Sequence, residues 1–106
     1  NEEIKKRYLL YYTMYYSQKE WRLLGFKRSQ VKGKKYSASI QHKTTGKKRT
    51  VNFGAIGYST YHDKTGLGLY DVHGTKKRKT SYRARHKVFV RKGFYSPSHF
   101  SYTFLW

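Results

Sequence analysis

The most regular pattern in the sequence is KYSASIQHKTTGKKRTVNF, residues 35–53. Apolar and polar side chains alternate in both of its halves, with the apolar positions at Tyr36, Ala38, Ile40, Val51 and Phe53. Alternation of this kind is typical of β-strands that bury one face. Between the halves, residues 43–47 (KTTGK) have the composition of a tight turn with Gly46 at a positive φ. The stretch therefore predicts an antiparallel β-hairpin.

Upstream of the hairpin, the chain is rich in tyrosine and predicts a helix. Glu2 and Glu3 suit the positive end of a helix dipole. One helical face follows from the spacing of Ile4, Tyr8, Tyr11 and Tyr15, and it is widened by Leu9, Tyr12 and Tyr16. Residues 23–26 (LLGF) are typical of a helix end followed by glycine. The basic residues form no single polar face, which favours a packing helix over a membrane-surface helix.

Further elements follow from glycines, capping residues and basic runs. Residues 26–35 predict a basic connector, and residues 62–74 predict a glycine-rich loop. Thr75 can cap a basic helix on which Tyr82, His86 and Phe89 form an apolar stripe. Ser96 followed by Pro97 is a helix start signal for a short aromatic C-terminal helix.

Together these elements predict a small α+β protein. It has an N-terminal helix, an antiparallel β-hairpin sheet of two or three strands, a basic helix and a short C-terminal helix. We divide the chain into a tyrosine-rich helix with its basic connector, residues 1–34, and a basic α+β domain, residues 35–106. The longest apolar run, residues 8–16, is far shorter than the ~20 residues that span a bilayer, and no signal-peptide cleavage site follows it.

The charge of the chain is strongly unbalanced. Lys and Arg number 24 against five Asp and Glu, so the formal net charge is +19. No acidic residue occurs between Trp21 and His62, or after Asp71. Such a domain repels itself, which predicts that it works against a polyanion or an acidic protein surface. The absence of Cys excludes disulfides and thiolate metal sites and fits a reducing compartment.

The basic side chains of the hairpin and of the basic helix are the predicted anion contacts. Lys and Arg neutralise phosphates or carboxylates there by releasing counterions, in a manner that weakens with salt. The predicted contact residues are Lys43, Lys47, Lys48, Arg49, Lys76, Lys77, Arg78, Lys79, Arg83 and Arg85.

Aromatic residues make up 19% of the chain, which separates it from an ordinary basic tail. Because aromatics and Arg are enriched at the cores of protein interfaces, this load predicts a component of a large assembly. The predicted interface aromatics are Tyr8, Tyr11, Tyr12, Tyr15, Phe100, Phe104 and Trp106. Four other rings are predicted to pack the hairpin against the basic helix, namely Tyr58, Tyr61, Tyr82 and His86.

Catalysis has little support in the sequence. Asp63 and Asp71 are the only acidic residues after Glu20, whereas metal nucleases use several acidic ligands. His62, Asp63, His73 and His86 could be drawn as a metal or nuclease site, but loop residues of these types are more often turn formers. The glycines have neither P-loop nor dinucleotide-binding spacing. We expect no catalytic residue, metal, cofactor or small-molecule substrate.

One part of the chain resembles a known family. KRTVNFGAIGYSTY at residues 48–61, KRK at 77–79 and YRARH at 82–86 are similar to small basic proteins encoded by nucleocytoplasmic large DNA viruses of algae and amoebae. These proteins are uncharacterised or virion-associated. The resemblance covers about residues 35–106, including the closing segment 96–106, but the longer loop at 65–74 departs from the family pattern. It implies a virus-particle protein without known enzyme activity.

These observations predict a non-enzymatic structural component of a large DNA virus particle. It would be a minor capsid or internal virion protein that bridges larger, acidic capsid proteins through its basic and tyrosine-rich surfaces. The expected location is the capsid interior or inner shell surface, and the host cytoplasm during assembly. The alternative is a sequence-nonspecific DNA- or RNA-binding protein, either genome-condensing or ribosomal. A small metal-dependent nuclease is a third reading.

Overall fold

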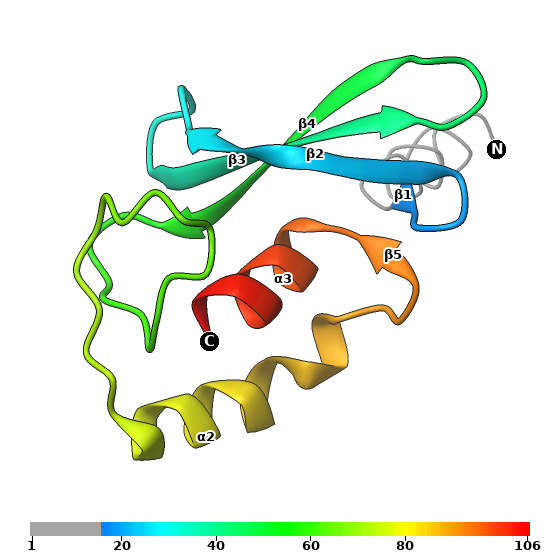
Figure 1. The fold of residues 1–106 in the computed structure, drawn as a ribbon. Helices are drawn as coiled ribbons and strands as arrows, with labels where there is room; N and C mark the ends of the chain where they lie inside the picture. Colours follow the sequence, from blue (N-terminus) through cyan, green and yellow to red (C-terminus); the bar gives the residue numbers. More distant parts are fainter. Residues whose placement is uncertain (1–15) are drawn as a thin grey trace, which may run out of the picture.

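The computed structural model describes residues 16–106 and has the predicted α+β composition. The main sheet is antiparallel and has the order β2–β3–β4, while a second sheet pairs β1 with β5. The strands are β1 (Tyr16–Ser17), β2 (Trp21–Arg28), β3 (Lys34–His42), β4 (Lys48–Ala55) and β5 (Phe94–Tyr95). The helices are α2 (Lys76–His86) and α3 (Pro97–Phe100), which continue into a 3-10 turn (Lys87–Phe89) and a π-helical turn (Ser101–Leu105). α3 lies between the main sheet and α2 (Figure 1).

The predicted hairpin is confirmed in β3 and β4. Tyr36 pairs with Phe53 and Ala38 with Val51, so the apolar positions of both strands share one face. That face is the core, because Tyr36, Ala38, Ile40 and Phe53 are completely buried. Gly46 in the connecting turn has the expected positive φ, at 75°.

Residues 23–28, predicted as a helix end and the start of a basic connector, lie instead in the strand β2, and residues 29–33 form the connection to β3. β2 pairs with β3 along its length, with Leu23 opposite Ile40 and Phe26 opposite Ala38. The register shifts between Leu23 and Gly25, and this irregularity lets Leu23 and Phe26 both pack on the core although they are three residues apart. The interval of three residues between Leu23 and Phe26 therefore matches the spacing along one face of a helix. The rest of the predicted N-terminal helix, with Tyr8, Tyr11, Tyr12 and Tyr15, lies outside the described residues.

The pairing of β2 also bears on the division of the chain. Residues 21–28 and 34–55 form one sheet, so the division proposed at residue 34 falls at the first residue of β3. Tyr16, which was assigned to the widened helical face, lies in β1 opposite Tyr95.

The C-terminal segment fills the core face of the sheet. As predicted, Ser96 caps α3, and its Oγ accepts a hydrogen bond of 3.1 Å from the backbone N–H of His99. Phe100 is fully buried, and its ring centroid lies 5.4 Å from that of Phe53 and 5.3 Å from that of Tyr95. Leu105 and Trp106 are also buried. Phe100 and Trp106, predicted as interface aromatics, are thus core residues of this chain, and Phe104 packs partly buried beside them.

Membrane insertion has no helical candidate in the described part of the chain. Among residues 16–106, no helix combines the length and the apolar character that crossing a membrane requires.

Candidate polyanion interface

The basic side chains of α2 divide into two groups. Lys79 and Arg83 point to the body of the protein, where Lys79 Nζ lies 4.5 Å from the ring centroid of Tyr61 and Arg83 Cζ lies 3.9 Å from that of Tyr102. Arg83 also donates a 3.1 Å hydrogen bond to the carbonyl of Tyr102. These two predicted contact residues therefore fix α2 to the body through cation–π contacts. The exposed group comprises Lys76, Lys77, Arg78 and Arg85.

The first turn of α2 concentrates positive charge at an unfavourable place. Lys76, Lys77, Arg78 and Lys79 are consecutive there, and no acidic residue accompanies them. The helix dipole places partial positive charge at this end, so the cations and the dipole repel each other. Thr75 is the N-cap, as predicted, but its side chain makes no capping hydrogen bond. An anion bound at this end would relieve both deficits.

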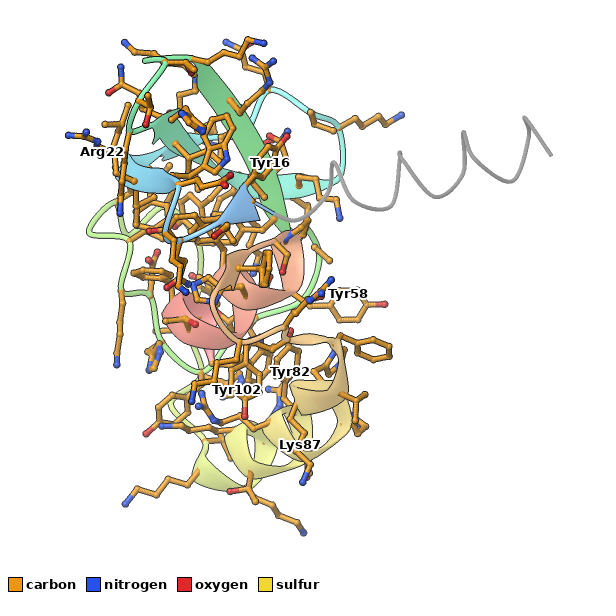
Figure 2. All side chains as sticks on the ribbon, turned by 90° about the vertical axis from the view of Figure 1, so that its right-hand side faces the viewer. Tyr16, Arg22, Tyr58, Tyr82, Lys87 and Tyr102 are labelled. Atoms are coloured by element: carbon orange, nitrogen blue, oxygen red, sulfur yellow. The ribbon has the colours of Figure 1, made fainter. Side chains whose placement is uncertain are left out.

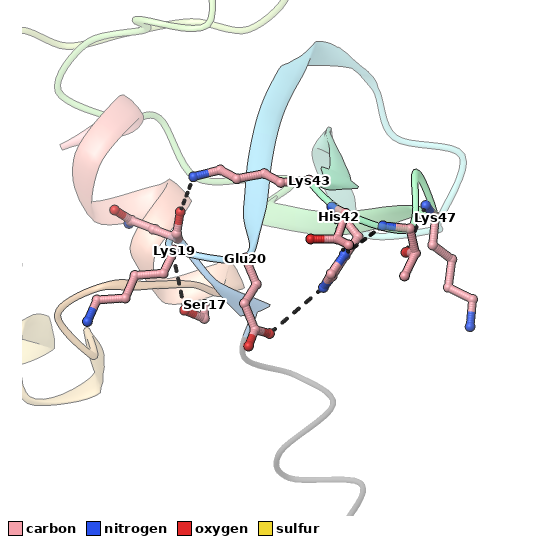
Figure 3. A network of polar contacts seen from close by, with 9 residues as sticks. Ser17, Lys19, Glu20, His42, Lys43 and Lys47 are labelled. Atoms are coloured by element: carbon pink, nitrogen blue, oxygen red, sulfur yellow. Dashed lines mark hydrogen bonds and ion pairs between the residues drawn. The ribbon is translucent and has the colours of Figure 1, made fainter.

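A second group of cations lies at the turn between β3 and β4. Residues 43–50 are all exposed, and they include the predicted contacts Lys43, Lys47, Lys48 and Arg49. Lys43 Nζ donates to the carbonyl of Gln18 at 3.1 Å, which ties this turn to the turn between β1 and β2 (Figure 3). The nearest carboxylate contact in this network joins Glu20 to His42 Nε2 at 4.0 Å. Lys47 and Lys48 form no ion pair within residues 16–106.

The two exposed cationic groups lie at different ends of the molecule. The β3–β4 turn is the tip of the hairpin at the upper right, whereas α2 lies at the bottom, on the far side of α3 (Figure 1). The view rotated by 90° shows the same separation, with α2 and Lys87 at the bottom (Figure 2). The predicted contacts therefore form two surfaces rather than one.

A cavity of about 630 Å³ separates α2 from β4 and the C-terminal residues. Its wall includes a stack of three rings, in which Tyr82 lies between His86 and Trp106. The ring centroids are 4.0 Å apart for Tyr82 and His86 and 4.2 Å apart for Tyr82 and Trp106, with interplanar angles of 12° and 6°. Lys77, Arg78 and Arg85 also line it, and no carboxylate does. Tyr82 thus packs on the C-terminal Trp106, and His86 packs on Tyr82 of its own helix, so these ring contacts join α2 to the C-terminal residues and not to the hairpin.

Two aromatic side chains lie elsewhere than predicted. Tyr58 was expected to pack between the hairpin and the basic helix, but it is 72% exposed and projects outward from the body (Figure 2). Phe89, expected in the apolar stripe of α2, is 57% exposed. α2 ends at His86 and continues as a tighter 3-10 turn, so the seventh position after Tyr82 no longer lies on the same face. Tyr61, which is also expected to pack between the hairpin and the basic helix, is partly buried against the core.

A second cavity, of about 670 Å³, lies on the opposite flank of α2. Lys64, Lys79, Arg83 and Lys92 line it, together with His62 and His99, and no carboxylate does. Burial lowers the pKa of His62, and the nearby charges of Lys64, Lys79 and Arg83 lower it further, while Asp63 opposes them. Burial also lowers the pKa of His99. No sequence pattern predicts this cluster, because Lys64 and Lys92 lie in two separate loops that only the fold brings together.

Asp63, considered above for a metal or nuclease site, serves to anchor the glycine-rich loop. Its carboxylate accepts hydrogen bonds from the hydroxyl of Tyr36 and from the backbone N–H of Thr65, the latter at 2.9 Å. Burial alone would raise the pKa of Asp63, but these hydrogen bonds outweigh burial and lower it. Among residues 16–106, no three His, Asp or Glu side chains gather closely enough to hold a metal ion. The exposed Lys and Arg side chains of α2 and of the β3–β4 turn are suited to binding anions.

Comparison with known proteins adds no relative to this geometry. The chain matches no protein-family model, no curated protein sequence and no solved structure. The resemblance of residues 48–61 and 77–86 to the viral family therefore stays a prediction that rests on those residues.

Proposed function

We propose that this protein is a non-enzymatic structural component that joins acidic surfaces within a large assembly. The observation that supports the proposal is the presence of exposed cations at two separate ends of a small domain, at the β3–β4 turn and on α2. Binding one partner requires only one such end, whereas bridging requires two. Following the family resemblance, the assembly is the particle of a large DNA virus, and the protein is a minor capsid or internal virion component.

The β3–β4 turn suits an acidic protein surface. Residues 43–50 (KTTGKKRT) offer exposed cations but contain no aromatic side chain that stacks on a nucleic acid base. Long, exposed Lys and Arg side chains adapt readily to an irregular distribution of carboxylates. We assign the acidic capsid-protein partner to this end.

The α2 end supports the second candidate function, which is nucleic acid binding. Exposed cations and an exposed ring occur together there, since Lys77, Arg78 and Arg85 share a cavity wall with Tyr58. Basic grooves with aromatic stacking platforms are the means by which proteins hold single strands without sequence preference. A protein with both ends engaged would link a capsid protein to the genome.

Two triple variants distinguish the ends. Lys47→Gln with Lys48→Gln and Arg49→Gln alters the turn, whereas Lys76→Gln with Lys77→Gln and Arg78→Gln alters α2. Each removes three positive charges from exposed residues, so each variant is the net-charge control of the other.

Binding of each variant is measured against polyglutamate and against single-stranded DNA over a range of salt concentrations. The turn variant is expected to lose mainly polyglutamate binding. The α2 variant is expected to lose mainly DNA binding, with a fall of about 2–3 in the slope of log affinity against log salt. Equal losses of both ligands in both variants would mean that net charge alone determines binding, which contradicts the assignment of ends.

A further inference from the structure

The cavity between α2 and the C-terminal residues has the shape and chemistry of a site for one flat, anionic group. Its volume of about 630 Å³ falls within the ~300–1,000 Å³ of typical small-ligand sites. The wall formed by Tyr82 and Trp106 is aromatic and nearly parallel, with an interplanar angle of 6°. Ala55 and Leu105 add apolar lining from β4 and the π-helical turn. Because Tyr82 and Trp106 stack on each other, they give the cavity apolar contact and no free stacking face.

One ring on the cavity wall has its aromatic face available to a ligand. Tyr58 is 72% exposed, the highest value among the exposed aromatic side chains of the described residues, although it lines the cavity. Tyr82 and Trp106 are engaged with each other, and Trp106 is nearly buried. No other ring of residues 16–106 packs on Tyr58, so its aromatic face is open to a partner that stacks on it.

The charges around the cavity specify the sign of the ligand. Lys77, Arg78 and Arg85 on the wall are exposed, and no carboxylate lines the cavity. Both Arg side chains can form paired hydrogen bonds to phosphate, which Lys supplements as a point charge. A ligand that combines a flat ring with phosphate on either side satisfies the whole wall.

We propose that this cavity receives one unpaired base of a single-stranded nucleic acid, which stacks on Tyr58 while the flanking phosphates contact Lys77, Arg78 and Arg85. The proposal rests on nucleic acid binding at the α2 end and names its substrate as single-stranded. Bases in a duplex are stacked on each other, so a duplex presents only its phosphates to these cations.

Trp106 provides a direct probe of the cavity. The chain has two Trp residues, so Trp21→Phe leaves Trp106 as the only one. This variant is titrated with a thymidine oligonucleotide and with an abasic oligonucleotide of the same length and charge, at moderate salt. We expect the thymidine oligonucleotide to quench Trp106 fluorescence and to bind about 5- to 100-fold more tightly than the abasic one. Anisotropy of labelled oligonucleotides measures the same ratio with Trp21 retained.

Single substitutions then locate the stacking contact. Tyr58→Ala is expected to abolish the preference for the thymidine oligonucleotide while leaving abasic binding unchanged. Phe89→Ala is the matched control, because Phe89 is also an exposed ring near α2 but does not line the cavity. Arg85→Gln is expected to weaken binding of both oligonucleotides by a similar factor.

The outcomes separate this inference from the proposed function. Equal affinity for thymidine and abasic oligonucleotides would overturn the base site and leave the electrostatic contact of α2 with nucleic acid intact. Binding of neither oligonucleotide would overturn both. A Tyr-containing polyglutamate peptide that quenches Trp106 where the thymidine oligonucleotide does not would show that the cavity takes a protein ring, which also contradicts the inference.

Discussion

Gly54 lies in β4 next to Leu105 of the C-terminal turn. It has a φ of 79°, a conformation that L-residues with a side chain rarely adopt. A Cβ built there would lie 3.1 Å from Leu105 Cδ1 and 3.2 Å from Lys35 Cβ. The glycine in the F-G-A string thus has a structural role, because it lets Leu105 and the stem of Lys35 pack against the strand.

We expect Gly54→Ala to destabilise the protein more than Gly57→Ala. Gly57 also has a positive φ, at 96°, but a Cβ there meets no atom within 4 Å. Gly57→Ala should therefore cost about 1–2 kcal/mol of unfolding free energy from backbone strain alone. Gly54→Ala should cost about 1–3 kcal/mol more because of the close contacts. Urea unfolding of both variants measures the difference, and equal losses would contradict the packing described for Leu105.

Three half-buried histidines predict how stability depends on pH. Burial lowers the pKa of His62, His73 and His99, and nearby cations lower it further for His62 and His73. Below the ordinary pKa of about 6.5, the unfolded chain therefore binds more protons than the folded protein. The stabilisation from the neutral imidazoles is therefore complete above about pH 6.5, and it is lost as the pH falls from there through the lowered pKa values of the folded protein.

Urea unfolding at about pH 7.5 and about pH 5.5 tests this dependence. We expect a lower unfolding free energy at the acidic pH, and we expect the decrease to persist at high salt. Salt screens repulsion between exposed charges but does not remove the cost of burying a charged imidazole. An unfolding free energy that is unchanged or higher at the acidic pH would contradict the assigned direction of these shifts.

At the scale of elements, the sequence predicts well where a periodic pattern is unbroken. The alternation at Tyr36, Ala38 and Ile40 predicted β3, and Ser96 with Pro97 predicted the start of α3. β2 escaped prediction because the shifted register after Leu23 replaces a period of two with a helix-like interval to Phe26. The cavities escaped as well, since β4, α2 and the C-terminal residues line one of them together although they are far apart in sequence.

The N-terminus of α2 offers a test of the helix electrostatics. Thr75→Asp would place a capping acceptor and a negative charge where the helix dipole and Lys76, Lys77 and Arg78 are positive. We expect the unfolding free energy to rise by about 0.5–1 kcal/mol and the affinity for single-stranded DNA to fall. Thermal unfolding and oligonucleotide titration measure the two effects.

Thr80→Asp is the control for that substitution. Thr80 is an exposed residue in the middle of α2, so it carries the same change of side chain and charge away from the helix end. It should weaken DNA binding to a similar degree without raising stability. If Thr80→Asp stabilised the protein as much as Thr75→Asp, net charge rather than the helix terminus would be responsible.

At the scale of the whole molecule, the sheet and the C-terminal core hold two cationic ends apart. The β3–β4 turn and α2 are both exposed, and α3 lies between α2 and the sheet (Figure 1). A chain of +19 that bound anions at one end alone would keep a repulsive excess of charge at the other. The arrangement favours a protein that is stabilised when both ends meet acidic partners, as expected inside a densely packed particle.

Simultaneous binding of two polyanions tests whether the protein bridges acidic partners through two separate ends. Beads that carry polyglutamate are loaded with the protein, washed, and incubated with labelled single-stranded DNA near physiological salt. If the two ends bind independently, bridging predicts that the protein recruits DNA to the beads. It also predicts that the triple glutamine variant of the turn and that of α2 each abolish recruitment, the first by losing the beads and the second by losing DNA. If DNA instead displaced the protein from the beads without being recruited, both polyanions would bind one shared surface. That result would contradict bridging by two separate ends.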